Sequence, residues 1–198
     1  PHPPPSLPPR PRGRTRDPMT RWAFNEAHTA AEFTVRHMMI TPVRGTFKNL
    51  QGTLEFDPDR PEDAWVETSI DASTLWSGEP ERDDHLRSED FLDVPRHPRI
   101  VFRSTGMVPV GRNEYRVTGE LSIRGVTHPV TLDVRYLGQC RSPFDDTRIG
   151  FTATTRINRH DFGVSWNADL KDSGFVVGDD VFITIDVEAE RPDETPPS

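Results

Sequence analysis

The sequence predicts an all-β domain whose strands close into an antiparallel up-and-down barrel. Apolar and polar residues alternate with a period of two along eight short runs, turn-forming residues separate the runs, and 198 residues are enough for a single core. One apolar and one wet face in run after run favours antiparallel pairing. A closed barrel gives all strands a shared interior and no exposed edge, whereas a two-sheet sandwich is an alternative that periodicity does not separate from it.

The eight runs follow one another along the chain. They cover residues 31–36, 53–56, 66–71, 100–104, 115–121, 130–135, 149–156 and 181–188. In the first run Ala31, Phe33 and Val35 alternate with polar residues, and the later runs repeat the pattern. Asp57-Pro58-Asp59, Arg124-Gly125 and Gly178-Asp179 are among the turn signals between them. No internal repeat or second domain interrupts this series.

A charged, helix-compatible segment, residues 82–91, interrupts the strands. Leu86 is its only apolar residue before Phe91, so a helix here has no amphipathic stripe. Arg82 and Leu86 would share one helical face, with His85 beside them. The segment is therefore either a solvated connection with internal salt bridges or a polar lid whose Arg82 and His85 offer donors to a ligand head group.

The interior that the alternation implies mixes large and small side chains. Phenylalanines alternate in the inward set with small residues, namely Ala31, Gly45, Gly52, Gly119 and Ala153. This mixture is typical of ordinary interdigitation, in which large residues fill the space left by small ones. It is also what a small-ligand cavity requires, since a barrel of about eight strands can be filled or can hold one ligand.

Enzyme motifs are not apparent. Four of the seven histidines, His37, His85, His97 and His160, are candidates, but they show no metal-site spacing. Cys140 is the only cysteine, and no nucleophile elbow or phosphate-binding glycine loop is present. We therefore predict neither a metal site nor a cofactor. In the turn at 158–163, Arg159 and Asp161 would point the same way if the backbone is extended, which suits a salt-bridged turn better than ligation.

Charge and composition exclude further classes. The net charge is −8, and 22 scattered arginines with only Lys48 and Lys171 form no basic stripe, which argues against nucleic-acid binding. No apolar run reaches the roughly 18 residues of a transmembrane segment. Residues 1–20, rich in Pro and Arg, and the tail 191–198 are predicted to be disordered around a domain at 21–190. Without a recognisable signal peptide, a cytoplasmic location is expected.

Several ordered motifs together resemble the YceI-like, or polyisoprenoid-binding, family from Trp22 to about Glu190. The motifs are Trp22-x-Phe24-x-x-x-His28-Thr29-x-x-x-Phe33-x-Val35-x-His37, Val43-x-Gly45-x-Phe47, Ile70-Asp-Ala-Ser73, Arg82-Asp83-x-His85-Leu86-Arg87-Ser88-x-Asp90-Phe91, His97-Pro98-x-Ile100-x-Phe102, Gly119-x-Leu121-x-Ile123-x-Gly125-Val126-Thr127, Ile157-Asn158-Arg159-x-Asp161-Phe162-Gly163 and Val177-Gly178-Asp179-x-Val181. Such a series in register is more specific than any single pattern.

The resemblance implies a lipocalin-like barrel of eight antiparallel strands with one short helix near residues 82–92. It also implies non-enzymatic binding or transport of a long-chain apolar lipid, such as a polyisoprenoid, an isoprenoid quinone or a fatty-acid-like chain. The residues expected to line its tunnel are Phe24, Phe33, Val35, Phe47, Leu54, Phe56, Ile70, Trp76, Leu86, Phe91, Phe102, Leu121, Phe151, Phe162 and Trp166. The candidates for contacting a head group are His37, Arg82, His85 and Arg159.

The chain also departs from the family pattern. Where relatives usually read Ser-Ile-Asp-Thr, this chain has Ser73-Thr74-Leu75-Trp76, and the bulk of Leu75 and Trp76 would reshape the tunnel near the lid. Two alternatives stay open from the residues: an enzyme acting on a small lipophilic substrate through His85, Arg159 and Asp161, and a filled barrel that serves as a protein-interaction module. The sequence is also compatible with a homodimer.

Overall fold

The structure is a computed structural model and describes residues 19–169 and 176–191. Most of the predicted terminal segments 1–20 and 191–198 lies outside the described residues. The strands are β1 (Arg21–Phe24), β2 (Ala30–His37), β3 (Thr41–Phe47), β4 (Gln51–Glu55), β5 (Trp65–Asp71), β6 (Arg99–Gly111), β7 (Glu114–Ile123), β8 (Val126–Arg141), β9 (Thr147–Asn158) and β10 (Val177–Glu190). The helices are α1 (Pro80–Arg87) and the short 3-10 turns η1 (Glu26–His28), η2 (Pro61–Asp63), η3 (Ala72–Thr74) and η4 (Arg159–Phe162).

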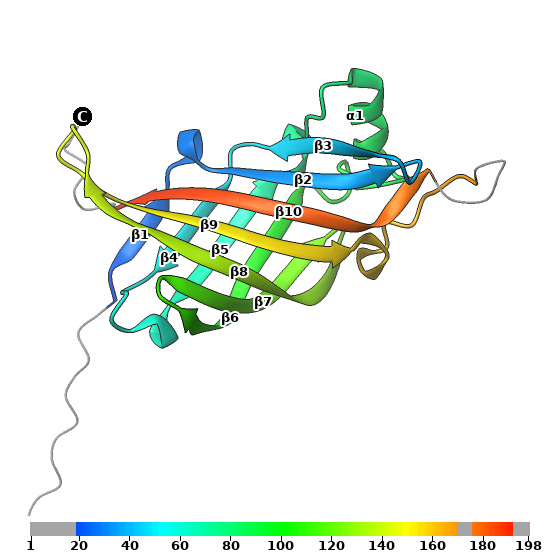
Figure 1. The fold of residues 1–198 in the computed structure, drawn as a ribbon. Helices are drawn as coiled ribbons and strands as arrows, with labels where there is room; N and C mark the ends of the chain where they lie inside the picture. The colour runs from blue at the N-terminus through cyan, green and yellow to red at the C-terminus, as the bar shows by residue number, and fades with distance from the viewer. Residues whose placement is uncertain (1–18, 170–175, 192–198) are drawn as a thin grey trace, which may run out of the picture.

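The ten strand segments form a closed antiparallel barrel of eight strands (Figure 1). β1 and β2 act as one bent strand because both pair with β10, and β3 and β4 act as another because they pair with β2 and β1 respectively. From β4 the sheet continues through β5, β6, β7, β8 and β9 to β10, each paired with the next strand in sequence. The predicted all-β, eight-stranded up-and-down barrel with a single short helix is confirmed.

Thr29 maintains the barrel wall where the first strand bends. The Thr29 hydroxyl donates to the Glu188 carbonyl oxygen at 3.2 Å and accepts from the Glu188 amide at 3.3 Å. Asn25 caps η1 through its side chain and donates its backbone amide to the same carbonyl at 2.8 Å. The Thr29 side chain and the Asn25 amide therefore make the hydrogen bonds to β10 that the strand backbone does not make at the bend between β1 and β2.

Thr74 has the same role at the second bend, between β3 and β4. Its hydroxyl lies 3.2 Å from the Lys48 amide and 3.0 Å from the Lys48 carbonyl oxygen. Asn49, next to it, adopts a positive φ of 58°, a conformation that Asn tolerates better than most residues. On the edge away from β2, β3 forms a bridge between Thr46 and Trp76. The wall beside β3 is therefore completed by the segment that leads to α1.

α1 differs slightly from the predicted helix. It begins at Pro80, whose fixed φ suits the first helical turn, and it ends at Arg87. Ser88 caps it with an extended backbone and an amide that donates to the Asp84 and His85 carbonyls. The turn predicted at 158–163 is present as η4, so its backbone is not extended. Asn158 caps η4 with its side chain, Arg159 is buried and Asp161 is exposed, so these two side chains do not share a direction.

The interior divides into two apolar clusters, one toward each end of the barrel. The cluster beside α1 includes Leu50, Leu75, Phe91 and Phe162. The cluster at the other end is aromatic, and there Phe56 packs edge-on against Phe151 with ring centroids 5.1 Å apart. No helix among the described residues is long and apolar enough to cross a membrane.

Candidate binding site: an apolar cavity and its lid

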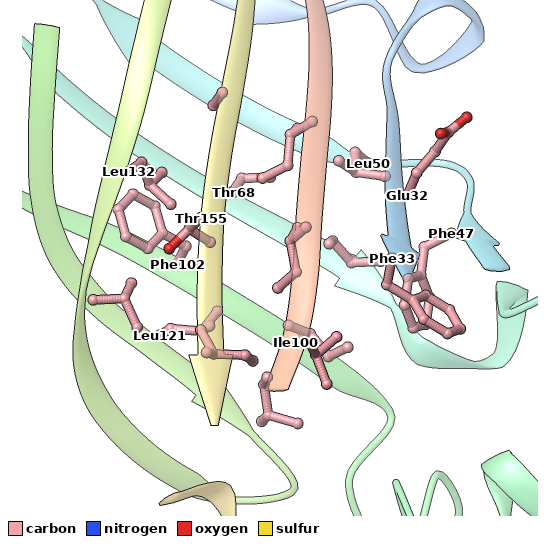
Figure 2. A pocket seen from close by; sticks show the side chains of 18 of the residues that line it. Glu32, Phe33, Phe47, Leu50, Thr68, Ile100, Phe102, Leu121, Leu132 and Thr155 are labelled. Atoms are coloured by element: carbon pink, nitrogen blue, oxygen red, sulfur yellow. The ribbon is translucent and has the colours of Figure 1, made fainter. Parts of the chain in front are cut away.

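A cavity of about 260 Å³ runs between the two clusters inside the barrel. Figure 2 shows side chains that line it, among them Phe33, Leu50, Ile100, Phe102 and Leu121 from four separate parts of the wall. The lining is apolar except for five residues: Glu32, Glu55, Thr68, Thr155 and Arg159. Inward side chains such as Phe33 and Leu121 are only half-buried because they border this cavity.

Three glycines let phenylalanine rings lie flat against the wall. A Cβ at Gly45 would stand 2.3 Å from Phe33, one at Gly52 would stand 2.6 Å from Phe24, and one at Gly119 would stand 2.4 Å from Phe102. Each ring thus occupies the place of a missing side chain on another strand. The small inward residues create room indirectly, since they keep aromatic rings close to the wall rather than across the axis.

The two threonines in the lining are already hydrogen-bonded to the wall. Thr68 Oγ1 donates to the Gln51 carbonyl oxygen at 2.9 Å, and Thr155 Oγ1 donates to the Thr131 carbonyl oxygen at 2.8 Å. A ligand in the cavity therefore meets no hydroxyl donor that needs a partner. Of the two carboxylates in the lining, Glu32 is exposed and points away from the labelled apolar side chains in Figure 2, and Glu55 is half-buried.

Arg159 is the one buried cation of the lining among the described residues, with 4% of its surface exposed. Its Nε donates to the Gly178 carbonyl at 2.9 Å, its Nη1 to the Val164 and Trp166 carbonyls at 2.7 and 2.9 Å, and its Nη2 to the Val177 carbonyl at 3.2 Å. Burial lowers the pKa of Arg159, opposed by the charge of Asp179 with Oδ1 3.8 Å from Nη2. The guanidinium therefore binds the loop after η4 to the start of β10.

α1 covers one end of the cavity and is held there by polar contacts. Arg82 donates from Nε to the Ser77 hydroxyl at 2.7 Å and from Nη2 to the Ser77 carbonyl at 2.8 Å, and the buried Asp83 carboxylate accepts from the Ser77 amide at 2.9 Å. Arg87 donates to the Ser73 and Leu75 carbonyls. The apolar contribution of the helix is Leu86, which faces the cavity. The segment is thus a lid secured by side chains that bind the chain just before it.

Aromatic contacts and a further arginine hold the segment that follows α1. The His85 ring packs edge-on against Phe91 and Trp166, with centroids 5.0 and 4.7 Å away, and its Nε2 lies 2.8 Å from Asp90 Oδ2. Arg124, in the β7–β8 turn, donates to the carbonyl oxygens of Glu89 and Gly163, both at 2.6 Å. The lid, the β7–β8 turn and the η4 turn are therefore connected to one another.

The structure brings most of the predicted tunnel residues together. The predicted tunnel residues that line the cavity are Phe24, Phe33, Val35, Phe47, Leu54, Phe56, Ile70, Leu86, Phe91, Phe102, Leu121, Phe151 and Phe162. Trp166 lies behind Phe91, with ring centroids 5.3 Å apart, rather than in the lining. Trp76 is 61% exposed, whereas its neighbour Leu75 is buried and lines the cavity. Of the two bulky residues at this departure from the family pattern, Leu75 alone adds to the cavity wall.

The predicted head-group residues do not gather at one point. Arg159 lines the cavity, but its donors are engaged with backbone carbonyls, and Arg82 and His85 are engaged within the lid. His37 ends β2 and pairs with Thr41 in the β2–β3 hairpin. Contact of these four residues with a ligand stays a prediction.

The enzyme alternative required His85, Arg159 and Asp161 to act together. Within residues 19–169 and 176–191, no hydrogen bond or ion pair joins any two of them, and Asp161 is exposed beyond η4. Over the same residues, no three His, Cys, Asp or Glu side chains are placed to hold one metal ion.

The inward face of β10 also lines the cavity and was not predicted to do so. Val181, Ile183, Ile185 and Val187 all line the cavity, as do Leu50 and Val130. The period of two along residues 181–188 was sufficient to find the first four. Leu50 carries no such signal because it lies in the bend between β3 and β4.

Comparisons with known proteins agree with this geometry. Residues 22–189 match the sequence model of a protein family described as YceI-like domain. A protein described as UPF0312 protein from Azotobacter vinelandii is 35% identical over 164 residues, which are 83% of this chain and 82% of that one. A UPF0312 protein from Pseudomonas fluorescens is 38% identical over 141 residues, covering 69% of this chain and 71% of the relative.

Solved structures share the barrel. BcnA from Burkholderia cenocepacia superposes with a TM-score of 0.74 and 25% identity, over 83% of this chain and 98% of that one. The YCEI protein of Campylobacter jejuni gives 0.66 and 26%, over 78% and 88%. A polyisoprenoid binding domain from Saccharophagus degradans, described as implicated in plant cell wall breakdown, gives 0.62 at 14% identity, over 88% and 99%, and this likeness concerns the fold alone.

Proposed function

This chain belongs to the YceI-like family, and we propose that its barrel binds a long, uncharged apolar chain. The proposed ligand is a polyisoprenoid or an isoprenoid quinone, which the barrel binds in preference to a fatty acid. The observation that carries the proposal is the apolar cavity, whose lining threonines and Arg159 are already hydrogen-bonded to backbone carbonyls. The polyisoprenoid-binding description of a structural relative supports the ligand class.

The size of the cavity indicates that it is not a packing defect. Unfilled cavity volume costs about 24 cal/mol per Å³ in core mutants, so a cavity of 260 Å³ would cost about 6 kcal/mol. That is comparable with the whole stability of many domains, about 5–15 kcal/mol. An apolar chain offsets this cost at about 0.8 kcal/mol for each methylene it buries. The same cavity argues against the filled-barrel alternative.

The polar groups of the lining favour an uncharged ligand. Four of the five N–H donors of Arg159 are taken up by carbonyls, and its Nη2 also lies 3.8 Å from Asp179 Oδ1, so at most one donor is left for a carboxylate or phosphate. Glu55, half-buried, would repel an anionic head group. Burying an unpaired charge is costly, so the ligand that fits the cavity carries its polar end, if any, outside.

A matched pair of variants tests the proposal. Ala153 is buried and points inward from β9, whereas Thr154 is exposed on the outer face of the same strand. We expect Ala153→Phe to abolish uptake of a polyprenol or long-chain quinone, measured by native mass spectrometry and by displacement of a polarity-sensitive dye, while Thr154→Phe binds normally. Equal binding by the two variants, or no uptake by the unmodified protein, would refute the proposal. Stronger binding of a fatty acid than of a polyprenol would refute the preference for an uncharged chain.

A further inference from the structure

Three consecutive apolar side chains lie exposed at the turn between β2 and β3. Met38, Met39 and Ile40, which we call the β2–β3 tip, are 42%, 62% and 75% exposed. They follow His37 and precede Thr41, the last pair of the hairpin. A convex tip of this kind offers no pocket for a small ligand but can enter a soft apolar medium.

The backbone of the tip shows that its residues are not those a tight turn prefers. Met38 and Met39 have φ values of 50° and 60°, the left-handed region that Asn and Gly adopt with least strain in two-residue hairpin turns. Two unbranched apolar side chains hold this conformation and point away from the core. Local turn stability does not explain their presence, which suggests a contact outside the molecule.

Unpaired positive charge lies beside the tip. Arg36 on β2 and Arg44 on β3 are exposed, and neither has an acidic partner among the described residues. Two acids at the start of the neighbouring strand β10 are paired with other residues, Asp179 with His160 at 2.8 Å and Asp180 with Arg156 at 3.7 Å. The hairpin thus combines an apolar tip with two free guanidinium groups although the whole chain has a net charge of −8.

The tip is linked to the end of the barrel that the lid covers. The Met38 amide donates to the Val176 carbonyl at 2.8 Å, and the next carbonyl, that of Val177, accepts from Arg159. Arg159 also holds the carbonyl of Trp166, whose ring packs on His85 and Phe91 of the lid segment. A change in the surroundings of the tip therefore has a short route to the cover of the cavity.

We propose that the β2–β3 tip inserts into the surface of an anionic lipid bilayer, with Arg36 and Arg44 at the level of the head groups. Apolar side chains enter the acyl boundary and cations beside them bind anionic lipids, the arrangement typical of proteins that lie on a membrane. Only the biological reason for docking rests on the proposed function, since a protein that carries an insoluble chain must contact the membrane in which that chain is dissolved. Docking itself does not require an occupied cavity.

Vesicle flotation tests the docking. The probe is a set of vesicles of phosphatidylcholine alone or with about a third of phosphatidylglycerol. We expect binding to the anionic vesicles only, and about a tenfold lower partition coefficient for each of Met39→Ser and Ile40→Ser. Arg36→Gln and Arg44→Gln should each reduce it about fivefold, with a weaker effect at high salt.

Phe144 supplies the matched control. It is 75% exposed like Ile40, but it lies in the β8–β9 turn at the opposite end of the barrel (Figure 1). Phe144→Ser should leave vesicle binding unchanged. The proposal is overturned if Phe144→Ser reduces binding as much as Ile40→Ser, if the tip variants bind normally, or if the unmodified protein does not bind anionic vesicles. The last two results would point to a protein partner for the tip.

Uptake of a polyprenol supplied in dilute ethanol, without vesicles, separates docking from cavity binding. The tip variants should keep normal uptake and normal thermal unfolding. Vesicle binding without uptake would contradict the proposed function alone, and uptake without vesicle binding would contradict the docking alone.

Discussion

Adding a single methyl group at Gly45 should close part of the cavity. The three heavy atoms nearest to the Cβ of Gly45→Ala would all belong to the Phe33 ring. Its Cζ would lie at 2.3 Å and its Cε1 at 2.5 Å. Carbon atoms pack at about 3.5–4.0 Å, so the ring must retreat by at least about 1 Å. The wall lies behind the ring, and the open direction is toward the cavity, where Phe33 already borders the lining.

The displaced ring should cost binding rather than folding. If it excludes two or three methylenes of the ligand, at about 0.8 kcal/mol each, affinity falls by about 2 kcal/mol, or roughly 30-fold. The free energy of unfolding should change by less than about 1 kcal/mol. Alanine gains about 0.5–1 kcal/mol over glycine inside a strand, and this offsets part of the strain at Phe33.

Binding is measured by dye displacement with a polyprenol, and stability by urea unfolding. Gly106→Ala is the matched control, because its nearest neighbour, Thr118 Oγ1, lies at an ordinary 3.4 Å. The double variant Gly45→Ala/Phe33→Leu should recover binding, since a smaller side chain at 33 leaves space for the new methyl group. Unchanged affinity in Gly45→Ala, or no recovery in the double variant, would show that the Phe33 ring does not set the width of the cavity.

Three further predictions concern Arg159, the lid and the tyrosines. Arg159→Met should lower the free energy of unfolding by about 3 kcal/mol in urea, because buried carbonyls lose their donors, whereas Arg156→Met should change it by less than about 0.5 kcal/mol; equal effects would contradict the role of Arg159. Arg124→Ala should speed amide hydrogen exchange in residues 86–92 while the melting temperature hardly falls, and unchanged exchange would mean that the contact to Glu89 does not hold the lid. Burial raises the pKa of Tyr115, and burial and the neighbouring Tyr115 raise the pKa of Tyr136, above their ordinary 10.0. Their stabilising contribution is therefore complete below pH 10 and is lost as the pH rises through the folded-state values, which phenolate absorbance and unfolding at about pH 9 and 11 would test; phenolate formation at the ordinary value would contradict it.

The alternation of apolar and polar residues was enough to predict the barrel, because every strand of a closed sheet has one dry face. It did not predict that two of the eight barrel strands are bent, so that one is divided into β1 and β2 and the other into β3 and β4. Those bends depend on Thr29 and Thr74, whose hydroxyls replace ladder bonds to residues far away in the sequence. A local pattern carries no information on such partners, so β1 and β3 were not recognised as separate strands.

The cavity lining was largely predictable and the polar contacts were not. Inward direction follows from strand position, so Phe33, Phe102 and Phe151 could be placed from sequence alone. The flat position of Phe33 could not, since it depends on Gly45 across the hairpin. Arg159 looked like a residue for a head group, but a buried arginine can equally bind carbonyls at the end of a sheet. Which of the two it does depends on the path of the loop after η4.

The charged lid and the apolar cavity have a common physical basis. A lid that closed the barrel by burying its own apolar face would fill the space that the ligand needs. α1 instead contributes Leu86 to the cavity and is held by Arg82 and Arg87, which bind carbonyls and a hydroxyl of residues 73–77. These two side chains are half-buried, so water can replace their hydrogen bonds at modest cost when the helix moves. Arg159 is buried and binds four carbonyls, so the opposite side of the same end stays fixed. The distribution of arginines therefore predicts that α1 opens more readily than the side held by Arg159, with the buried Asp83 carboxylate, which accepts from the Ser77 amide, as its firmest polar contact.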